Sequence, residues 1–361
     1  MATYGINMHH PELRHPYSDV PPYQFWKRSV SAVEAHLIDP VTHARFTVGK
    51  DDAVATAGSC FAQHISRRIR RSGYRYLVTE ERADLSAEER TRANYGVFPA
   101  RFGNIYTTMQ LLQLFEEAFG ERGTSSEAWL RPDGRYVDAL RQQVEPGGFA
   151  TPDCVARDRA LHLKCVRRMF EQADVFIFTL GLTEAWRSRD DGTVFSAAPG
   201  VLGGAFDSNR HEFVNFSVEE TYCALRDFLA KFHAINPTAK ALLTVSPVPL
   251  IATYEDRSVL ASNAYSKSVL RVAADMTIRD HDWVDYFPSY EIITNSSAGG
   301  LYYQSDHREV NSLGVAHAMR CFMRNYTADG GSCYATPWEI EDYTTSRQVI
   351  CDEKILNLAR D

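Results

Sequence analysis

One cysteine of the sequence stands in a context that suggests chemistry. Cys60 follows the apolar run 51–57 and Gly58, and a helical pattern with Phe61 and Ile65 on one face begins directly after it. A cysteine between a strand and a helix N-terminus lies among unpaired amides and near the positive end of the helix dipole, which lowers the pKa of its thiol. The same amides could hold an oxyanion. The pattern predicts a nucleophile, and the alternative is a small buried residue that packs under the sheet.

Two further polar clusters are expected near Cys60. Residues 181–184 (GLTE) follow the apolar run 174–180, and residues 306–309 (DHRE) precede the last helical pattern. The carboxyl ends of parallel strands meet at one edge of a sheet, where α/β proteins gather their functional residues. A carboxylate at such a place is costly unless it is paired, so we expect Glu184 to face the pocket with a partner.

Apolar runs alternate with helical patterns along most of the chain. This alternation predicts an α/β fold with a parallel sheet and helices on both of its faces. The expected strands are 51–57, 174–180, 241–245 and 284–287, and the expected helices are 107–118, 156–172, 217–235, 259–276 and 311–324. Residues 123–150 are expected to form an insertion of irregular strands, and residues 193–216 a long loop rich in Gly and Asn.

The distribution of prolines and apolar residues predicts three parts of unequal size. Residues 1–50, broken by five prolines, are expected to be an irregular arm packed on the core. Residues 51–325 are expected to form the main domain. Residues 326–361 are aromatic and charged without clear periodicity, and we expect them to form a C-terminal extension.

The composition excludes several classes of function. The 361 residues carry a formal charge of −7, which gives nucleic-acid binding no electrostatic support. No apolar run approaches the roughly 18 residues of a membrane helix, and none at the N-terminus could act as a signal peptide, so we expect a cytoplasmic protein. The seven cysteines are scattered and form no CxxC pair. A disulfide framework or a zinc site is therefore not expected, and no metal or other cofactor is predicted.

Several segments resemble the signatures of the GSCFA family. The string 56–64 (TAGSCFAQH) contains the letters that name the family. Further similar segments follow in order: Tyr95-Gly96, 101–107 (RFGNIYT), 178–186 (FTLGLTEAW), 244–249 (TVSPVP), 286–291 (YFPSYE) and 306–314 (DHREVNSLG). The resemblance covers roughly residues 50–325. Because that family is similar to SGNH hydrolases, the resemblance implies an SGNH-like or flavodoxin-like fold of three layers, with ester or acyl-transfer chemistry.

The resemblance also implies roles for individual residues. Cys60 stands where the Gly-Asp-Ser block of SGNH hydrolases has its serine, and Thr183 stands at the position of the oxyanion asparagine, where its hydroxyl could still donate a hydrogen bond. Arg101 and Arg308 are possible partners of Glu184. The residues implied in oxyanion or substrate binding are Ser59, Gly103, Asn104, Thr183, Glu184, Arg101 and Arg308.

The last block departs from the SGNH pattern Asp-x-x-His. Asp306 is present, but Glu309 takes the place of the histidine that would act as the base. Three residues could replace it: His307 in the same loop, Glu309 itself, or His64, four residues after Cys60 on the same helical face. A cysteine biased toward thiolate needs less help than a serine, so a site without a base is a further alternative.

Two classes of function follow from these residues. The first is an esterase or acyltransferase that forms a thioester on Cys60 and acts on a small-molecule, sugar or acyl substrate. The alternative is a catalytically degenerate protein of the same fold that binds a carbohydrate or peptide, as the missing histidine suggests. A redox sensor is disfavoured because no resolving cysteine lies nearby in the sequence. The sequence specifies no oligomeric state.

Overall fold

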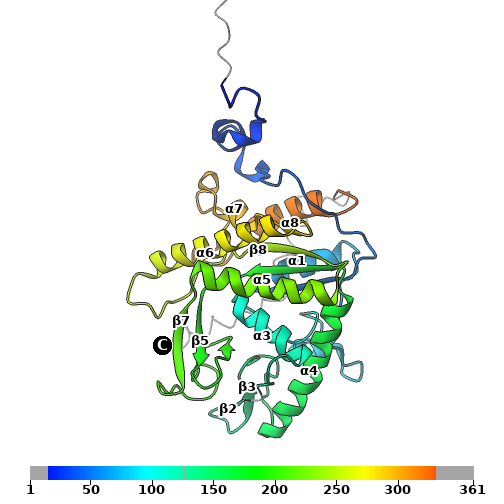
Figure 1. The fold of residues 1–361 in the computed structure, drawn as a ribbon, viewed down its shortest axis with the longest axis vertical. Coiled ribbons are helices and arrows are strands. Elements are labelled where there is room, and N and C mark those ends of the chain that lie inside the picture. The colour runs from blue at the N-terminus through cyan, green and yellow to red at the C-terminus, as the bar shows by residue number, and fades with distance from the viewer. Residues whose placement is uncertain (1–14, 126, 331–361) are drawn as a thin grey trace, which may run out of the picture.

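The centre of the molecule is a parallel sheet of four strands. The structure, a computed structural model, describes residues 15–125 and 127–330. The sheet has the order β1-β4-β8-β9, and neighbouring strands run parallel in every pair (Figure 1). In the described part of the chain the strands are β1 (Val54–Gly58), β2 (Ala128–Leu130), β3 (Tyr136–Asp138), β4 (Val175–Leu180), β5 (Glu184–Ser188), β6 (Val194–Phe195), β7 (His211–Asn215), β8 (Lys240–Val245) and β9 (Val284–Tyr286).

Helices follow most strands of the main sheet. The α-helices are α1 (Ala62–Arg71), α2 (Ala87–Arg92), α3 (Thr108–Phe119), α4 (Pro152–Gln172), α5 (Val218–Ile235), α6 (Val259–Asp280), α7 (Ser289–Thr294) and α8 (Ser312–Tyr326). Short helical turns are η1 (Pro22–Gln24), η2 (Lys27–Ser31), η3 (Ala35–Leu37) and η4 (Ser296–Ala298). None of the helices in the described ranges is both long and apolar enough to cross a bilayer.

Each face of the sheet has its own apolar core. Successive side chains of a strand point to opposite faces, so Phe176 and Phe178 of β4 enter one core while Val175 and Ile177 enter the other. Residues of α3, α4, α5 and α6 complete the first core, and residues of α1, α7 and α8 complete the second. The predicted α/β fold, with a parallel sheet covered by helices on both faces, is therefore confirmed.

The order of the strands locates a switch in the direction of winding. On the outer side of β1, Tyr76 forms a parallel bridge with Val54, and the backbone N–H of Leu77 donates to the carbonyl of Val54. The segment around Tyr76 therefore lies on one side of β1, and β4 lies on its other side. This is the flavodoxin-like strand order. Ligands of such sheets bind outside the carboxyl ends of the two strands at the switch, here β1 and β4.

A small antiparallel sheet contradicts the prediction of a long loop over residues 193–216. β6 and β7 lie within this range, and both pair with β5, in the order β6-β5-β7. The prediction was wrong because β6 has only two residues and the Gly- and Asn-rich stretch between β6 and β7 obscured both strands. In Figure 1 this sheet lies beside α3, below the main sheet.

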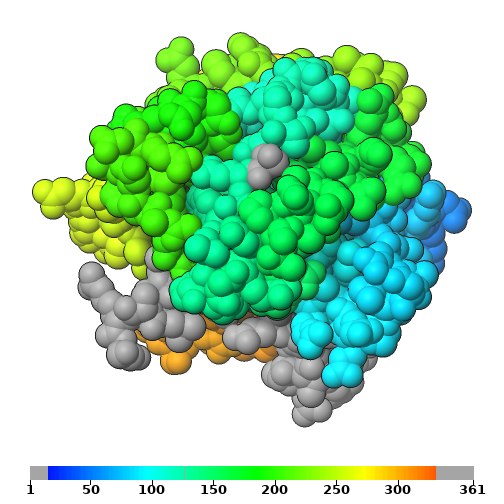
Figure 2. All heavy atoms as spheres, turned by 90° about the horizontal axis from the view of Figure 1, so that it is seen from below, coloured from blue at the N-terminus to red at the C-terminus, as the bar shows by residue number. Residues whose placement is uncertain are grey.

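Buried ion pairs attach the segment between β1 and β4 to α4. Arg159 of α4 donates to the Glu117 carboxylate at 2.7 Å, and Arg141 donates to Asp158 of α4 at 2.8 Å. Arg159, Glu117 and Arg141 are almost fully buried, and Asp158 is partly buried. Figure 2 shows the face that this region forms, where the cyan-to-green segments make up most of the surface. Because a buried charge without its partner is strongly unfavourable, these pairs fix the segment against the helix.

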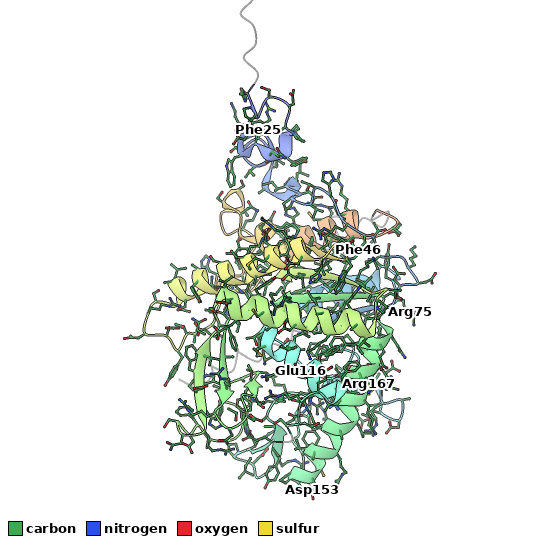
Figure 3. All side chains as sticks on the ribbon, in the orientation of Figure 1. Phe25, Phe46, Arg75, Glu116, Asp153 and Arg167 are labelled. Atoms are coloured by element: carbon green, nitrogen blue, oxygen red, sulfur yellow. The ribbon has the colours of Figure 1, made fainter. Side chains whose placement is uncertain are left out.

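The first part of the described N-terminal segment extends away from the main body, and the later part packs on it. Residues near Phe25 extend beyond the helices at the top of the molecule, whereas Phe46 lies against the main body (Figure 3), where its ring meets that of Tyr326. The side chain of Arg45 donates to three carbonyls between Ile278 and Val284. Residues 1–14 of the predicted arm and 331–361 of the predicted extension lie outside the described residues.

Candidate functional site

A glycine with an unusual backbone conformation ends β1 directly before the candidate nucleophile. Gly58 has φ +127°, and a Cβ on this residue would lie 2.2 Å from the carbonyl oxygen of Thr179 on β4. The next residue, Ser59, donates its backbone N–H to the same carbonyl at 3.1 Å. Only glycine allows the two strands to approach this closely at that dihedral angle. The chain then turns through Cys60 into α1.

Three segments meet at this turn. Ile105 donates its N–H to the carbonyl of Gly58 at 2.9 Å, and Gly181 and Leu182 both donate to the carbonyl of Tyr106 at 3.0 Å. A Cβ on Gly181 would lie 3.1 Å from that of Ser59, so these two residues are in close contact. The structure therefore brings the 58–60 and 181–184 clusters together, with residues 103–106 beside them.

Cys60 itself is mostly buried, with 7% of its surface exposed. Its carbonyl accepts the N–H of Gln63 in the first turn of α1, so the residue lies at the predicted strand-to-helix junction. Ser59 is more deeply buried, and within residues 15–125 and 127–330 its hydroxyl has no hydrogen-bond partner. A buried hydroxyl without a partner carries a desolvation cost, which a bound polar group could remove.

Asn104 lies next to α1 through the first-turn residue Gln63. The Gln63 side-chain amide donates to Asn104 Oδ1 at 3.5 Å, and both side chains are buried. Gly103, which precedes it, has φ +74°, and a Cβ there would meet nothing within 4 Å.

Thr183 is buried and its hydrogen bonds are used within the protein. Its hydroxyl donates to Asn215 Oδ1 at 2.7 Å, and its backbone N–H donates to the hydroxyl of Ser266 at 3.1 Å. The Lys267 ammonium, 1% exposed, donates to the Gly181 carbonyl at 2.8 Å. Sequence reasoning missed Ser266 and Lys267 because both stand inside a helical pattern, α6, far from any strand end.

The 306–309 cluster lies against the end of β8. The Arg308 guanidinium donates to the carbonyl of Pro249, and Tyr303, just before the cluster, donates its hydroxyl to the carbonyl of Pro247. Asp306 Oδ1 accepts the N–H groups of Arg308 and Glu309, both at 3.0 Å. The turn therefore lies at the same edge of the sheet as the other clusters, since β8 is the neighbour of β4.

The three candidate bases differ in their surroundings. His307 is exposed and has φ +52° at the tip of the turn, while Glu309 is partly buried. His64 is partly buried on α1 with its ring against Phe61. Burial, with a smaller contribution from Arg67, lowers the pKa of His64 to about 3. A cationic His64 paired with a Cys60 thiolate is therefore disfavoured at neutral pH.

The expected pairing of Arg101 with Glu184 is not formed. Arg101 is 1% exposed, and its guanidinium donates to the carbonyls of Ala93 and Val144, to Tyr95 and to Asp158. These contacts tie the segment between β1 and α3 to Val144 and to α4. Because its Nε, Nη1 and Nη2 atoms all donate into this network, Arg101 has a structural role and is not among the proposed substrate-binding residues.

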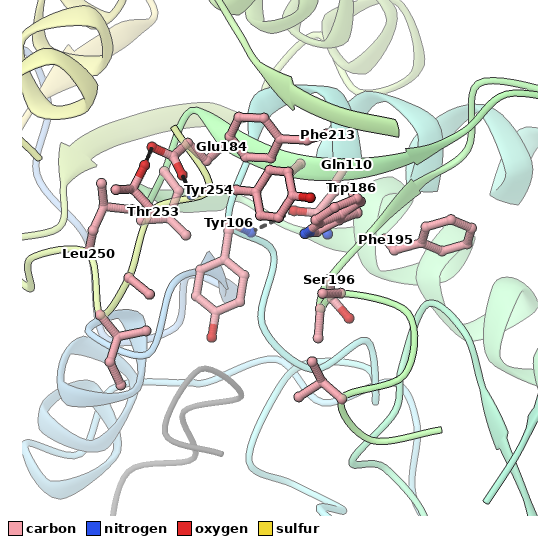
Figure 4. Close-up of a pocket in the computed structure, with 17 residues that line it drawn as sticks. Tyr106, Gln110, Glu184, Trp186, Phe195, Ser196, Phe213, Leu250, Thr253 and Tyr254 are labelled. Carbon is pink, nitrogen blue, oxygen red and sulfur yellow. Dashed lines mark hydrogen bonds between the residues drawn. The ribbon is translucent and has the colours of Figure 1, made fainter. Parts of the chain in front are cut away.

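Glu184 does face a cavity, as predicted, but its partners are different. The cavity has a volume of about 340 Å³ and is lined partly by β5 and by residues 250–254 (Figure 4). Glu184 Oε1 accepts the hydroxyl of Thr253 at 2.7 Å, and Oε2 accepts the N–H of Tyr254 at 3.4 Å. Burial, together with nearby Glu255, raises the pKa of Glu184. Tyr106 also lines the cavity, which therefore adjoins the turn around Cys60.

The fold and this cluster define a three-layer α/β protein with a cysteine at the switch point of its sheet. The model of the GSCFA family matches residues 53–322, and the chain belongs to this family. No curated protein matches the chain, and no solved structure matches it either. Across the described ranges, no group of three or more His, Cys, Asp or Glu side chains could hold a metal ion.

Proposed function

We propose that this protein is an acyl-group enzyme, an esterase or acyltransferase, that uses Cys60 as its nucleophile. The observation that carries the proposal is the turn Gly58-Ser59-Cys60 at the switch point. Gly58 has no room for a side chain, and its carbonyl and the next N–H are both hydrogen-bonded to neighbouring segments. A rigid turn holds the Cys60 sulfur in one position, which is what a nucleophile needs in order to attack a bound substrate.

The proposed reaction has two steps. First, the Cys60 sulfur attacks the carbonyl carbon of an ester or thioester, a C–S bond forms, and the carbonyl oxygen becomes an oxyanion. The oxyanion collapses, the bond to the alcohol or thiol of the donor breaks, and this leaving group takes the proton of the Cys60 thiol. In the second step water, an alcohol or an amine attacks the thioester and returns the thiol.

The surrounding groups suggest how the steps are assisted. The first N–H groups of α1 already donate to carbonyls within the turn, so the side-chain amide of Asn104, which lies next to α1, is the proposed oxyanion donor. The Thr183 hydroxyl is not a proposed donor, because its single proton is already donated to Asn215 Oδ1. Glu309 and His307 remain the proposed proton acceptors.

Intact-mass spectrometry tests the proposal. The protein is incubated with activated acyl thioesters as wild type, as Cys60→Ala and as Cys154→Ala, a control that removes a more accessible cysteine. We expect a single acyl adduct in the wild type and in Cys154→Ala, located on the peptide that contains Cys60, and none in Cys60→Ala. An adduct that persists in Cys60→Ala would contradict the proposal.

A second candidate is a binding protein without catalytic activity. Two observations favour it: a well-formed cavity of about 340 Å³ adjoins the site, and the Asp306 carboxylate caps its own turn. This function predicts retention of a ligand that is unaffected by Cys60→Ser. Mass spectrometry compares the ligands extracted from the purified wild type and from Cys60→Ser. The same ligand in both, together with no acyl adduct in the acylation experiment, would support the binding protein.

A further inference from the structure

One wall of the cavity is made by the face of the small antiparallel sheet. Glu184 and Trp186 are two residues apart on β5, so their side chains lie on the same face, and Phe213 of β7 is the cross-strand partner of Trp186. The ring of Tyr254 packs on both aromatic rings, at centroid distances of 4.9 Å to Trp186 and 5.3 Å to Phe213. Figure 4 shows these rings grouped beside the Glu184 carboxylate.

The charge of the lining has one sign. Of the lining residues in the ranges 15–125 and 127–330, Glu184 is the one with a carboxylate, and no lysine, arginine or histidine is among them. A phosphate or carboxylate in the cavity would therefore meet a like charge without a cation to pair with it. A cation would gain the attraction of Glu184 and of the negative faces of the aromatic rings.

The rest of the lining suits an apolar body. Leu182, Val201, Leu250 and Ile251 contribute aliphatic surface, with four alanines between them. A sugar, which carries a hydroxyl on most of its carbons, would leave many of these groups without hydrogen bonds against such walls. The lining therefore favours a ligand with a single charged group at the Glu184 end and hydrocarbon elsewhere.

We propose that this cavity binds an organic cation: an ammonium group held at Glu184 and against the Trp186 and Tyr254 rings, with an apolar body in the remaining space. The proposal rests on the acyl-group function and deepens it, because it names an amine as the acyl acceptor. The cavity adjoins the Cys60 turn through Tyr106 and Leu182, which line it and are hydrogen-bonded to each other. In the transfer step Glu184 would accept one proton from the ammonium. The amine nitrogen would then attack the thioester carbon, an amide would form as the C–S bond breaks, and the second proton of the nitrogen would return to the Cys60 sulfur to give the thiol.

The experiment measures binding without chemistry. Three probes of similar size are titrated by NMR into the full chain carrying Cys60→Ala: phenethylamine, phenethyl alcohol and phenylacetate, which are cationic, neutral and anionic at pH 7. We expect the amine to bind about tenfold more tightly than the alcohol, as one ion pair with aromatic contacts provides, and the anion to bind most weakly.

Two variants show whether Glu184 is responsible. Glu184→Gln keeps the shape of the side chain and an oxygen for Thr253, so it should bring the amine and the alcohol to within about twofold of each other. Glu116→Gln, on the outer side of α3, removes the same charge elsewhere and should leave the preference unchanged. Equal binding of the amine and the alcohol, tighter binding of the anion, or no binding of any probe would overturn the proposal. Because Cys60 is absent throughout, these results are independent of whether Cys60 forms a thioester.

Discussion

Replacing Gly58 by alanine should lower the free energy of unfolding strongly, because the new side chain would clash with β4. The new Cβ would lie 2.2 Å from the oxygen and 2.7 Å from the nitrogen of Thr179, both backbone atoms of the central strand β4 that cannot rotate away. An alanine at φ +127° carries strain of roughly 1–3 kcal/mol. Moving β1 away from β4 to relieve the clash adds the cost of overpacking and of weakened hydrogen bonds. Together we expect a loss on the order of 4 kcal/mol, a large part of the usual stability of a domain.

The assay is urea unfolding followed by circular dichroism, with Gly103→Ala as the matched control. Gly103 also has a positive φ, +74°, but its Cβ would meet nothing within 4 Å, so the change should cost only about 1–2 kcal/mol. The difference between the two variants isolates the close approach of the strands. Equal destabilisation by the two substitutions would refute the reasoning, because conformational strain alone would then account for both.

Two further predictions concern buried charged and titratable groups. Arg159→Met leaves the Glu117 carboxylate buried without its partner and should cost about 3–5 kcal/mol of stability in urea unfolding. Arg167→Met, the control, breaks the exposed pair with Glu171 and should cost less than about 1 kcal/mol. Similar losses in the two variants would contradict the role of the buried pair. Burial lowers the pKa of His317 to about 4, so the unfolded chain binds more protons than the folded one between about pH 4 and 6.5. Stability should therefore fall as the pH falls through this range, and His317→Asn should flatten the slope; an unchanged slope would show that other groups cause it.

The sequence allowed the main sheet and its helices to be predicted closely. Each central strand is a short apolar run, because it is buried on both faces, and each long helix keeps an apolar stripe of helical period. The predicted helix 217–235 begins at a Ser217–Glu220 capping box, which the structure contains. These signals are local, so the residues that carry them are visible without knowledge of the fold.

The small sheet could not be predicted in the same way. β5 has partly buried residues throughout, and its partners β6 and β7 lie on either side of a Gly-rich stretch, so neither strand shows a clear alternation. Its stability comes from cross-strand contacts such as Trp186 with Phe213, which depend on pairing between distant residues. The cavity beside Glu184 was therefore only half anticipated: the carboxylate was predicted, and the aromatic wall was not.

At the candidate site, the sequence predicted which segments meet but not what each side chain contacts. The positions of Cys60 and 181–184 after predicted strands, and of 306–309 before the last helix, predicted that these segments meet at one edge of the sheet, where the structure has them. The surroundings of Arg101 and His64 could not be predicted from the sequence, because the burial and the neighbours of a side chain depend on the whole fold. From the sequence, Arg101 was expected to pair with Glu184 and His64 was a candidate base. In the structure Arg101 donates into a separate hydrogen-bond network, and burial lowers the pKa of His64 to about 3.

The central claim is that Cys60 turns over an acyl group. The most direct measurement isolates the acylated protein, removes the donor and follows the loss of the adduct by mass spectrometry, with and without an added amine, against the same adduct in urea-unfolded protein. We predict that the folded protein loses its acyl group much faster than the unfolded one and that the acyl group is found on the added amine as an amide. Decay at the same rate in both, with no amide formed, would mean that Cys60 is merely a reactive thiol and would contradict the account.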